Sequence, residues 1–245
     1  MSMLTVGVFT GTGDRQVNED SVGAGAFAER KEKIYVLCDG LGGHGYGDAA
    51  SNIAKRAFLD TFAEYDGDAA AYFALAFDKA QNSIIEEQKK NSAMSQMKTT
   101  LVALVVDGSR CTWAHIGDSR LYYFRDGSLV SRTADHSVPQ MLMKAGEITE
   151  DEIRFHPDRN KLLRALGDAD NEPKYTVSET VEAEEGTAFL LCSDGFWEYI
   201  TEDMMEKYLR ESVGAQQWVD LMCRTVEENN RNEKADNYSA ITVMI

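Results

Sequence analysis

Four aspartates share one setting, because each lies where an apolar, strand-like run begins or ends. They are Asp39, Asp118, Asp194 and Asp236. One such residue is commonly a turn residue, but a lone carboxylate is costly to bury and disfavoured inside a strand, so four suggest a shared site. A cation bound among them would offset their mutual repulsion. Oxygen ligands without clustered Cys or His are typical of magnesium or manganese sites rather than zinc or copper sites.

A glycine-rich stretch follows the first of these acids. Five glycines occur within the eight residues after Asp39, so the acid and a main chain free of Cβ atoms could offer both side-chain and carbonyl oxygens to one cation. A plain strand-to-helix turn and a phosphate cradle are alternatives, although the cradle lacks the Lys-Ser/Thr ending of a P-loop.

Two cations bridged by one carboxylate could hold a water molecule, lower its pKa and direct it at a phosphorus or carbonyl centre. An arginine nearby would supply a two-pronged grip on phosphate. Arg15 is the candidate, because it lies just before Glu19 and Asp20. Its alternative role is that of an ordinary surface arginine.

Length and charge limit the class of protein. The chain has 245 residues and a formal net charge of −16, so we expect a single domain spanning 1–245. The charge would repel nucleic acid and anionic membranes, and neither is an expected partner, although solubility alone explains most of the excess. No apolar window is long enough to span a bilayer and the first residues lack a signal-peptide pattern, which predicts a cytoplasmic protein.

The cysteines at 38, 111, 192 and 223 show no close paired spacing. This argues against a zinc knuckle and a disulfide framework, and favours small core residues. Oxidation of Cys38 or Cys192 could disturb a neighbouring acid, which is the weaker alternative.

The elements that must position the acids are mostly strands. Strands are predicted over 4–9, 34–38, 100–106, 111–116, 121–124, 128–131, 175–180, 188–192 and 237–245. Helices are predicted over 49–65, 69–88, 202–211 and 216–229, with short ones over 140–145, 151–155 and 160–166. Asp-Gly pairs at 107 and 126 predict two hairpins, which we expect to form one β-meander with Asp118 at the turn between adjacent strands.

Seven motifs in order resemble the protein phosphatase 2C family, the metal-dependent serine/threonine phosphatases. Each is weak alone, but together they are specific, and the compact length and Gly-Gly-His resemble the bacterial branch. The motifs are Arg15-x-x-Asn18-Glu19-Asp20, Asp39-Gly40-Leu41-Gly42-Gly43-His44, Thr99-Thr100, Gly117-Asp118-Ser119-Arg120, Asp135-His136-Ser137, Ser193-Asp194-Gly195 and Asp236-Asn237.

The resemblance implies an α+β fold: a four-layer α/β/β/α sandwich with two central antiparallel sheets flanked by helix pairs. It also implies a flap beside the active site at about 139–172, a segment bracketed by prolines. Two core Mn²⁺ or Mg²⁺ ions are implied. Asp39 would bridge them and the Gly40 carbonyl would bind one, while Asp194 and Asp236 would hold the other.

Further residues are implied around these ions. Glu19 would reach a metal through water, Asp20 and Asn237 would support the metal ligands, and Asp118 with Asp194 would offer a third metal position.

The implied reaction is direct hydrolysis of phosphoserine or phosphothreonine in proteins. Arg15 would bind the phosphoryl group, and the water bridging the ions on Asp39 would attack phosphorus in line without a phosphoenzyme. Animal relatives carry His directly after the first Asp-Gly, proposed as the general acid, where this chain has Leu41. A metal-bound water or His44 is left as the acid.

By the same resemblance, the partners would be phosphoproteins, among them a bacterial serine/threonine kinase and its targets, and the enzyme would be a monomer. One alternative is a catalytically weak relative that acts as a phosphoprotein-binding regulatory module, although such proteins typically lose metal ligands. Another is a two-metal nuclease or other phosphodiesterase, which the negative charge disfavours.

Overall fold

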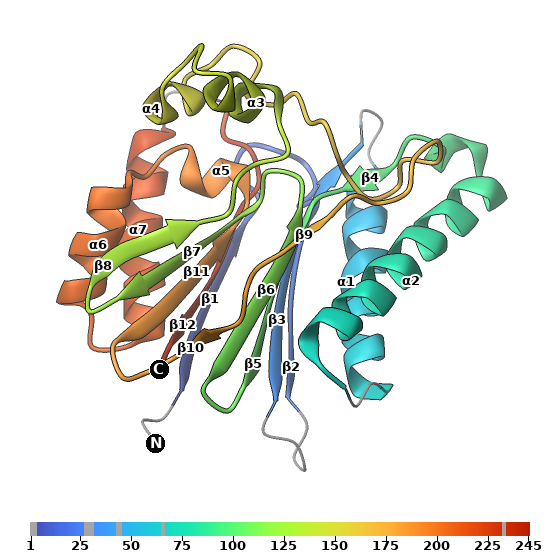
Figure 1. Cartoon of the computed structure of the whole chain (residues 1–245). Coiled ribbons are helices and arrows are strands. Elements are labelled where there is room, and N and C mark those ends of the chain that lie inside the picture. The colour runs from blue at the N-terminus through green and yellow to red at the C-terminus, as the bar shows by residue number, and fades with distance from the viewer. Residues whose placement is uncertain (1–3, 27–31, 43–45, 65–66, 232–233) are drawn as a thin grey trace.

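Two antiparallel sheets lie face to face in the middle of the molecule, with α1 and α2 covering one and α6 and α7 covering the other (Figure 1). The computed structural model describes residues 4–26, 32–42, 46–64, 67–231 and 234–245. Separate apolar cores fill the three spaces between the four layers. The predicted α/β/β/α sandwich is therefore confirmed.

The first sheet has the strand order β10-β6-β5-β3-β2. Its interior strand β3 is apolar on both sides: Val36 faces the helices and Leu37 faces the other sheet, since both faces are covered. The strands are β2 (Asp20–Ala26), β3 (Lys33–Leu41), β5 (Leu101–Asp107), β6 (Arg110–Ile116) and β10 (Val181–Glu182), with β4 (Lys98–Thr99) on β3 and β9 (Thr176–Val177) on β6.

The second sheet has the order β1-β12-β11-β7-β8. Its strands are β1 (Thr5–Gly11), β7 (Arg120–Arg125), β8 (Ser128–Arg132), β11 (Thr187–Cys192) and β12 (Tyr238–Met244). The predicted hairpin between β7 and β8 is present, and Asp126 and Gly127 both take positive φ angles, of 50° and 76°. Such angles suit a tight hairpin turn and explain the Asp-Gly signal.

Helices cover the outer face of each sheet. They are α1 (Gly47–Glu64), α2 (Ala69–Lys90), α6 (Glu202–Glu211) and α7 (Ala215–Asn229), with the single-turn helices η1 (Ser92–Met94) and α5 (Asp194–Trp197). Asp68 caps α2 by accepting a hydrogen bond from the Ala71 N–H at 2.9 Å. Phe58 of α1 meets Phe77 of α2 edge to face, with ring centroids 5.0 Å apart.

Two short helices, α3 (Val138–Lys144) and α4 (Glu150–Ile153), lie in or at the edge of the segment predicted as a flap, about 139–172, at the upper end of the molecule in Figure 1. Both were predicted, but the helix predicted over 160–166 is wrong. That segment is extended and pinned by two isolated bridges, Ser137 to Leu162 and Thr99 to Leu166. Tertiary pairing overrides its helical pattern.

The predicted β-meander is also wrong. β6 lies in the first sheet and β7 in the second, so the residues between them cross from one sheet to the other. Gly117, with a φ of 100°, makes this turn beside Thr100. Asp118 follows at the crossing point.

All four cysteines are free and buried, as predicted for small core residues. Burial raises the pKa of the Cys38 and Cys192 thiols, which keeps them protonated and unreactive. Among the described residues, no helix combines the length and apolar character needed to cross a bilayer.

Candidate metal centre

The acids predicted from the sequence meet at one cavity of about 240 Å³, between the ends of the two sheets and the flap. All four strand-end aspartates line it, although they are far apart in the sequence. The lining residues are Arg15, Glu19, Asp39, Gly40, Leu41, Gly42, Asp118, Asn160, Leu162, Asp194, Asp236 and Asn237.

Asp39 lies near the end of β3, and two threonines hold its main chain. Its N–H donates to Thr100 Oγ1 at 3.1 Å, and its carbonyl oxygen accepts from Thr100 N–H and Thr99 Oγ1, both at 2.8 Å. The neighbouring strand places Asp20 directly opposite Asp39. The Thr99-Thr100 motif therefore fixes the strand end from which the Asp39 carboxyl group projects.

The Asp39 and Asp194 carboxyl groups lie close enough for each to affect the pKa of the other. Burial, with the charge of Asp194 second, raises the pKa of Asp39 well above its ordinary value. Burial and nearby carboxylates likewise raise the pKa values of Asp118 and Asp194. A bound cation would favour the charged forms and remove this electrostatic cost.

Asp20 is a buried acid behind this pair. Its Oδ2 accepts from Ser193 Oγ at 2.9 Å, whereas its Oδ1 has no hydrogen-bond partner among the described residues. Burial raises the pKa of Asp20 to about 7. An unpaired buried oxygen calls for an explanation, and a nearby cation or water is the usual one.

Glu19 joins the cavity to the start of α1. Its Oε1 accepts from the N–H of Gly47, the first residue of that helix, at 3.0 Å. Gly40 packs against the same residue, and a Cβ added to Gly40 would lie 2.1 Å from the Gly47 carbonyl oxygen. Glycine at position 40 is therefore required by close main-chain packing, and Glu19 fixes the helix that packs there.

Asn237 organises the loop that carries Arg15. Its Oδ1 accepts from Glu19 N–H at 2.8 Å, and its Nδ2 donates to the carbonyl oxygens of Thr12 at 2.8 Å and Val17 at 3.1 Å. Arg15 Nη2 in turn donates to Asp236 Oδ2 at 2.7 Å. This hydrogen bond, with the Asp236 charge, raises the pKa of Arg15.

The donor set fits a hard divalent cation. The described lining offers carboxylate, amide and carbonyl oxygens with no His or Cys, which suits magnesium or manganese. Within the described ranges, no three acidic, His or Cys side chains form a preassembled ligand set. Asp236 is hydrogen-bonded to Arg15. Cation binding at the Asp236 carboxylate would have to replace this contact.

Some lining residues were missed by sequence reasoning. Asn160 and Leu162 reach the cavity from the flap, and only the predicted position of the flap pointed to them. Leu41 lines the cavity as well, at the position where animal relatives carry a histidine. His44, considered as an acid, lies outside the described residues.

Comparisons with known proteins support the same family. The model for "Protein phosphatase 2C" matches residues 12–237. The serine/threonine protein phosphatase PstP of Mycobacterium tuberculosis is 34% identical over 229 residues, which cover 93% of this chain and 42% of PstP. The chain thus spans less than half the length of PstP.

Two further matches agree. The serine/threonine phosphatase stp of Listeria welshimeri is 30% identical over 236 residues, 94% of this chain and 90% of stp. The crystal structure of the PstP catalytic domain in complex with two manganese ions superposes with a TM-score of 0.83 at 29% identity, covering 98% of this chain and 97% of that domain. With the family model matching most of its length, the chain belongs to the protein phosphatase 2C family.

Proposed function

We propose that the protein is a metal-dependent protein-serine/threonine phosphatase. The observation that carries the proposal is the convergence of Asp39, Asp118, Asp194 and Asp236 with Arg15 at one cavity. The family membership and the names of the relatives PstP and stp support it.

In this proposal, two Mn²⁺ or Mg²⁺ ions are held by Asp39, the Gly40 carbonyl, Asp194 and Asp236, with Glu19 acting through water. When bound, such ions activate water and neutralise phosphoryl charge. Asp118 offers a third metal position. Support for two ions comes from the oxygen-only lining and from the PstP domain solved with two manganese ions.

The chain's own contribution is to position the phosphoryl group. Arg15, 59% exposed at its side chain, is placed to donate two hydrogen bonds to phosphate oxygens. The described lining offers no Cys or His nucleophile, which supports hydrolysis without a phosphoenzyme. The proton for the leaving alkoxide would come from a metal-bound water or from His44. Loss of about a thousandfold in kcat in His44→Ala, with metal binding unchanged, assigns it to His44.

The decisive experiment measures release of phosphate from a phosphothreonine peptide. We expect turnover that stops with chelator and returns with Mn²⁺, and that is lost in Asp39→Asn. Failure of the folded, metal-loaded protein to turn over, together with tight binding of the phosphopeptide, supports a regulatory binding module instead. Faster hydrolysis of a phosphodiester than of the monoester supports a phosphodiesterase.

We further propose that the natural targets are a serine/threonine kinase and its substrates, that the protein acts in the cytoplasm, and that it works as a monomer. The relatives named as serine/threonine phosphatases motivate the first point. A phosphoproteome comparison of cells carrying the wild type or Asp39→Asn tests it. Sites that gain phosphate only with the variant are the expected targets.

A further inference from the structure

Trp197 makes a buried hydrogen bond to the residue proposed for a third metal. Its indole Nε1–H donates to the Asp118 main-chain oxygen at 3.0 Å. Trp197 is 2% exposed and Asp118 is 4% exposed. Trp197 is also the last residue of α5, the one-turn helix that begins with Asp194. A shift of the Trp197 indole would therefore move the main chain of Asp118, a proposed metal ligand.

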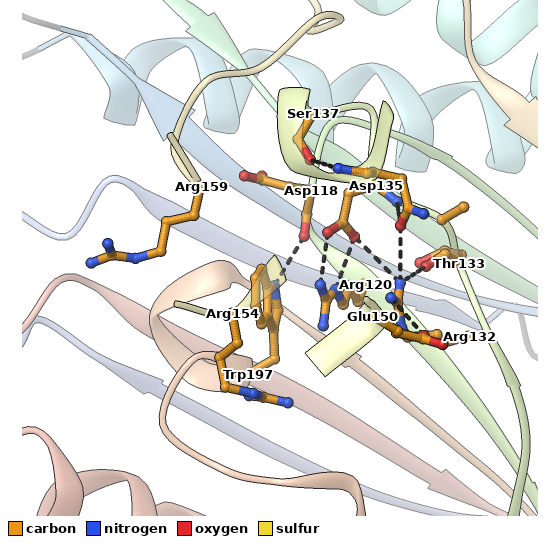
Figure 2. Close-up of polar contacts among 12 residues, drawn as sticks. Asp118, Arg120, Arg132, Thr133, Asp135, Ser137, Glu150, Arg154, Arg159 and Trp197 are labelled. Carbon is orange, nitrogen blue, oxygen red and sulfur yellow. Dashed lines mark hydrogen bonds and ion pairs between the residues drawn. The ribbon is translucent and has the colours of Figure 1, made fainter. Parts of the chain in front are cut away.

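A buried arginine lies over the ring of Trp197. The centre of the Arg120 guanidinium is 3.4 Å from the ring centroid, and its Nε and Nη2 donate to the Asp135 carboxylate at 2.8 and 2.7 Å (Figure 2). Asp135 N–H donates to Gln140 Oε1 of flap helix α3 at 3.2 Å. Arg120, Asp135 and Gln140 are each at most 5% exposed. We call Asp118, Trp197, Arg120, Asp135 and Gln140 the buried chain.

The second flap helix also reaches this ring. Arg154 follows α4, and its guanidinium lies 5.6 Å from the centroid of the Trp197 ring. It is fixed by hydrogen bonds to the Ile200 carbonyl oxygen at 2.8 Å and to the Glu202 carboxylate. Figure 2 shows Arg120 and Arg154 both beside Trp197, with Asp118 at the indole nitrogen.

This arrangement suits positioning better than stability. A buried ion pair such as Arg120–Asp135 adds little net stability over an apolar replacement. Its two parallel hydrogen bonds, however, fix the plane of the Arg120 guanidinium, and this plane in turn holds the Trp197 ring that it covers. Hydrogen bonds to groups behind a metal ligand orient that ligand.

We propose that Trp197 is a positioning residue for Asp118, and that the other members of the buried chain hold its ring in place. The inference rests on the proposed metal site. Contiguity alone does not establish a positioning role, so the test has to separate positioning from ordinary core packing.

Trp218 provides a matched control. It is fully buried, and its Nε1–H also donates to a main-chain oxygen at 3.0 Å, that of Met205 in α6, which lies outside the cavity lining. Trp197→Phe and Trp218→Phe thus remove the same indole N–H from comparable surroundings. Only the first removal affects the Asp118 main chain.

Calorimetric titration of the metal-free protein with Mn²⁺, without substrate, gives the readout. We expect Trp197→Phe to weaken the Asp118-dependent binding event about tenfold, and Trp218→Phe to leave it unchanged. Asp118→Asn should remove that event, and adding Trp197→Phe should then change nothing further. Gln140→Leu should weaken the same event.

Wild-type Mn²⁺ binding by folded Trp197→Phe, or equal weakening in Trp218→Phe, overturns the proposal. If Trp197→Phe does not fold, benzothienylalanine at position 197 replaces only the N–H by sulfur while filling the same space, and the same expectations hold. If Trp197→Phe weakens Mn²⁺ binding as expected but the wild type hydrolyses no phosphopeptide, only the proposed function is contradicted. If the wild type is a phosphatase but Trp197→Phe binds Mn²⁺ normally, only the positioning role is contradicted.

Discussion

Arg15 Nη2 lies 2.7 Å from Asp236 Oδ2, so the residue proposed to bind phosphate is bonded to a residue proposed to bind metal. Their side chains are 59% and 42% exposed, so the pair can open at little cost. An incoming cation would release Arg15 from Asp236, and an incoming phosphate would attract the freed guanidinium. Cation and phosphate therefore favour the same rearrangement.

Replacing Arg15 with Ala should separate these two roles. We expect tighter Mn²⁺ binding, by a few-fold, because Asp236 loses a competing cationic partner, and a loss of about a hundredfold in kcat/KM for a phosphopeptide, because a transition-state contact is removed. Titration calorimetry and steady-state kinetics measure the two effects. Arg210→Ala is the control, since Arg210 is a surface arginine paired with Glu206 away from the cavity. Weaker Mn²⁺ binding in Arg15→Ala contradicts this account.

Asp39→Asn should abolish phosphatase activity, by about a thousandfold or more, on the scale of a lost essential group. The metal-free variant should melt at a higher temperature than the metal-free wild type, because folding raises the pKa of Asp39 and an amide at this position removes that cost. Asp107→Asn is a matched control, as Asp107 is an exposed aspartate that also ends a strand before glycine. Lower thermal stability of metal-free Asp39→Asn argues against such a cost.

Asp20 should make the metal-free protein less stable as pH rises. Folding raises the pKa of Asp20 from 3.8 to about 7, so the folded state binds the proton more tightly than the unfolded state. The contribution of Asp20 to the free energy of unfolding is fully present below pH 3.8. It is lost between pH 4 and 7, because the unfolded chain ionises over this range while the folded protein stays protonated. Asp20→Asn lacks this loss.

The measurement for Asp20 is the difference in melting temperature between Asp20→Asn and wild type, in chelator, from pH 4 to 7. The difference should move in favour of the variant by several degrees as pH rises. Burial lowers the pKa of His136 to about 3, so His136 makes the protein more stable as pH rises toward 6.5. Both proteins contain His136, so its effect cancels in the difference between their melting temperatures. A difference that does not change with pH refutes the assigned pKa shift.

Gly40→Ala should destabilise the protein by about 2 kcal/mol or more and weaken Mn²⁺ binding. Its Cβ would lie 2.1 Å from the Gly47 carbonyl oxygen, so β3 and the start of α1 must separate. Chemical denaturation measures the stability, and calorimetry measures the binding. Gly214→Ala is the control, because Gly214 has an extended main chain and no described atom within 4 Å of an added Cβ. Equal effects in both variants contradict the close-packing argument.

Much of the fold followed from local signals. The Asp126-Gly127 turn needed positive φ angles, and the long helices showed clear apolar periods. The strand β2 was missed because its sequence, Asp20–Ala26, is rich in Gly and Ala and poor in residues typical of strands. Its position depends on pairing with β3.

The site was harder to derive, because its geometry is entirely tertiary. The strand ends identified the aspartates, but only the fold brings Asp39 and Asp194 to the same cavity. The Arg15–Asp236 ion pair joins residues that the sequence assigned to different ligands. Trp197 carried no signal at all, since an indole that supports a metal ligand has the same local pattern as one that fills a core.

The crossing between the sheets at Gly117 and Asp118 has a mechanical consequence. Asp20 and Asp39 belong to the first sheet, Asp194 and Asp236 adjoin strands of the second, and Asp118 lies between them. Cations bound by this set would act as noncovalent cross-links between the two halves of the sandwich. Because the proposed ligands come from both sheets, a small slide of one sheet against the other would separate them, and activity would then report the alignment of the two sheets.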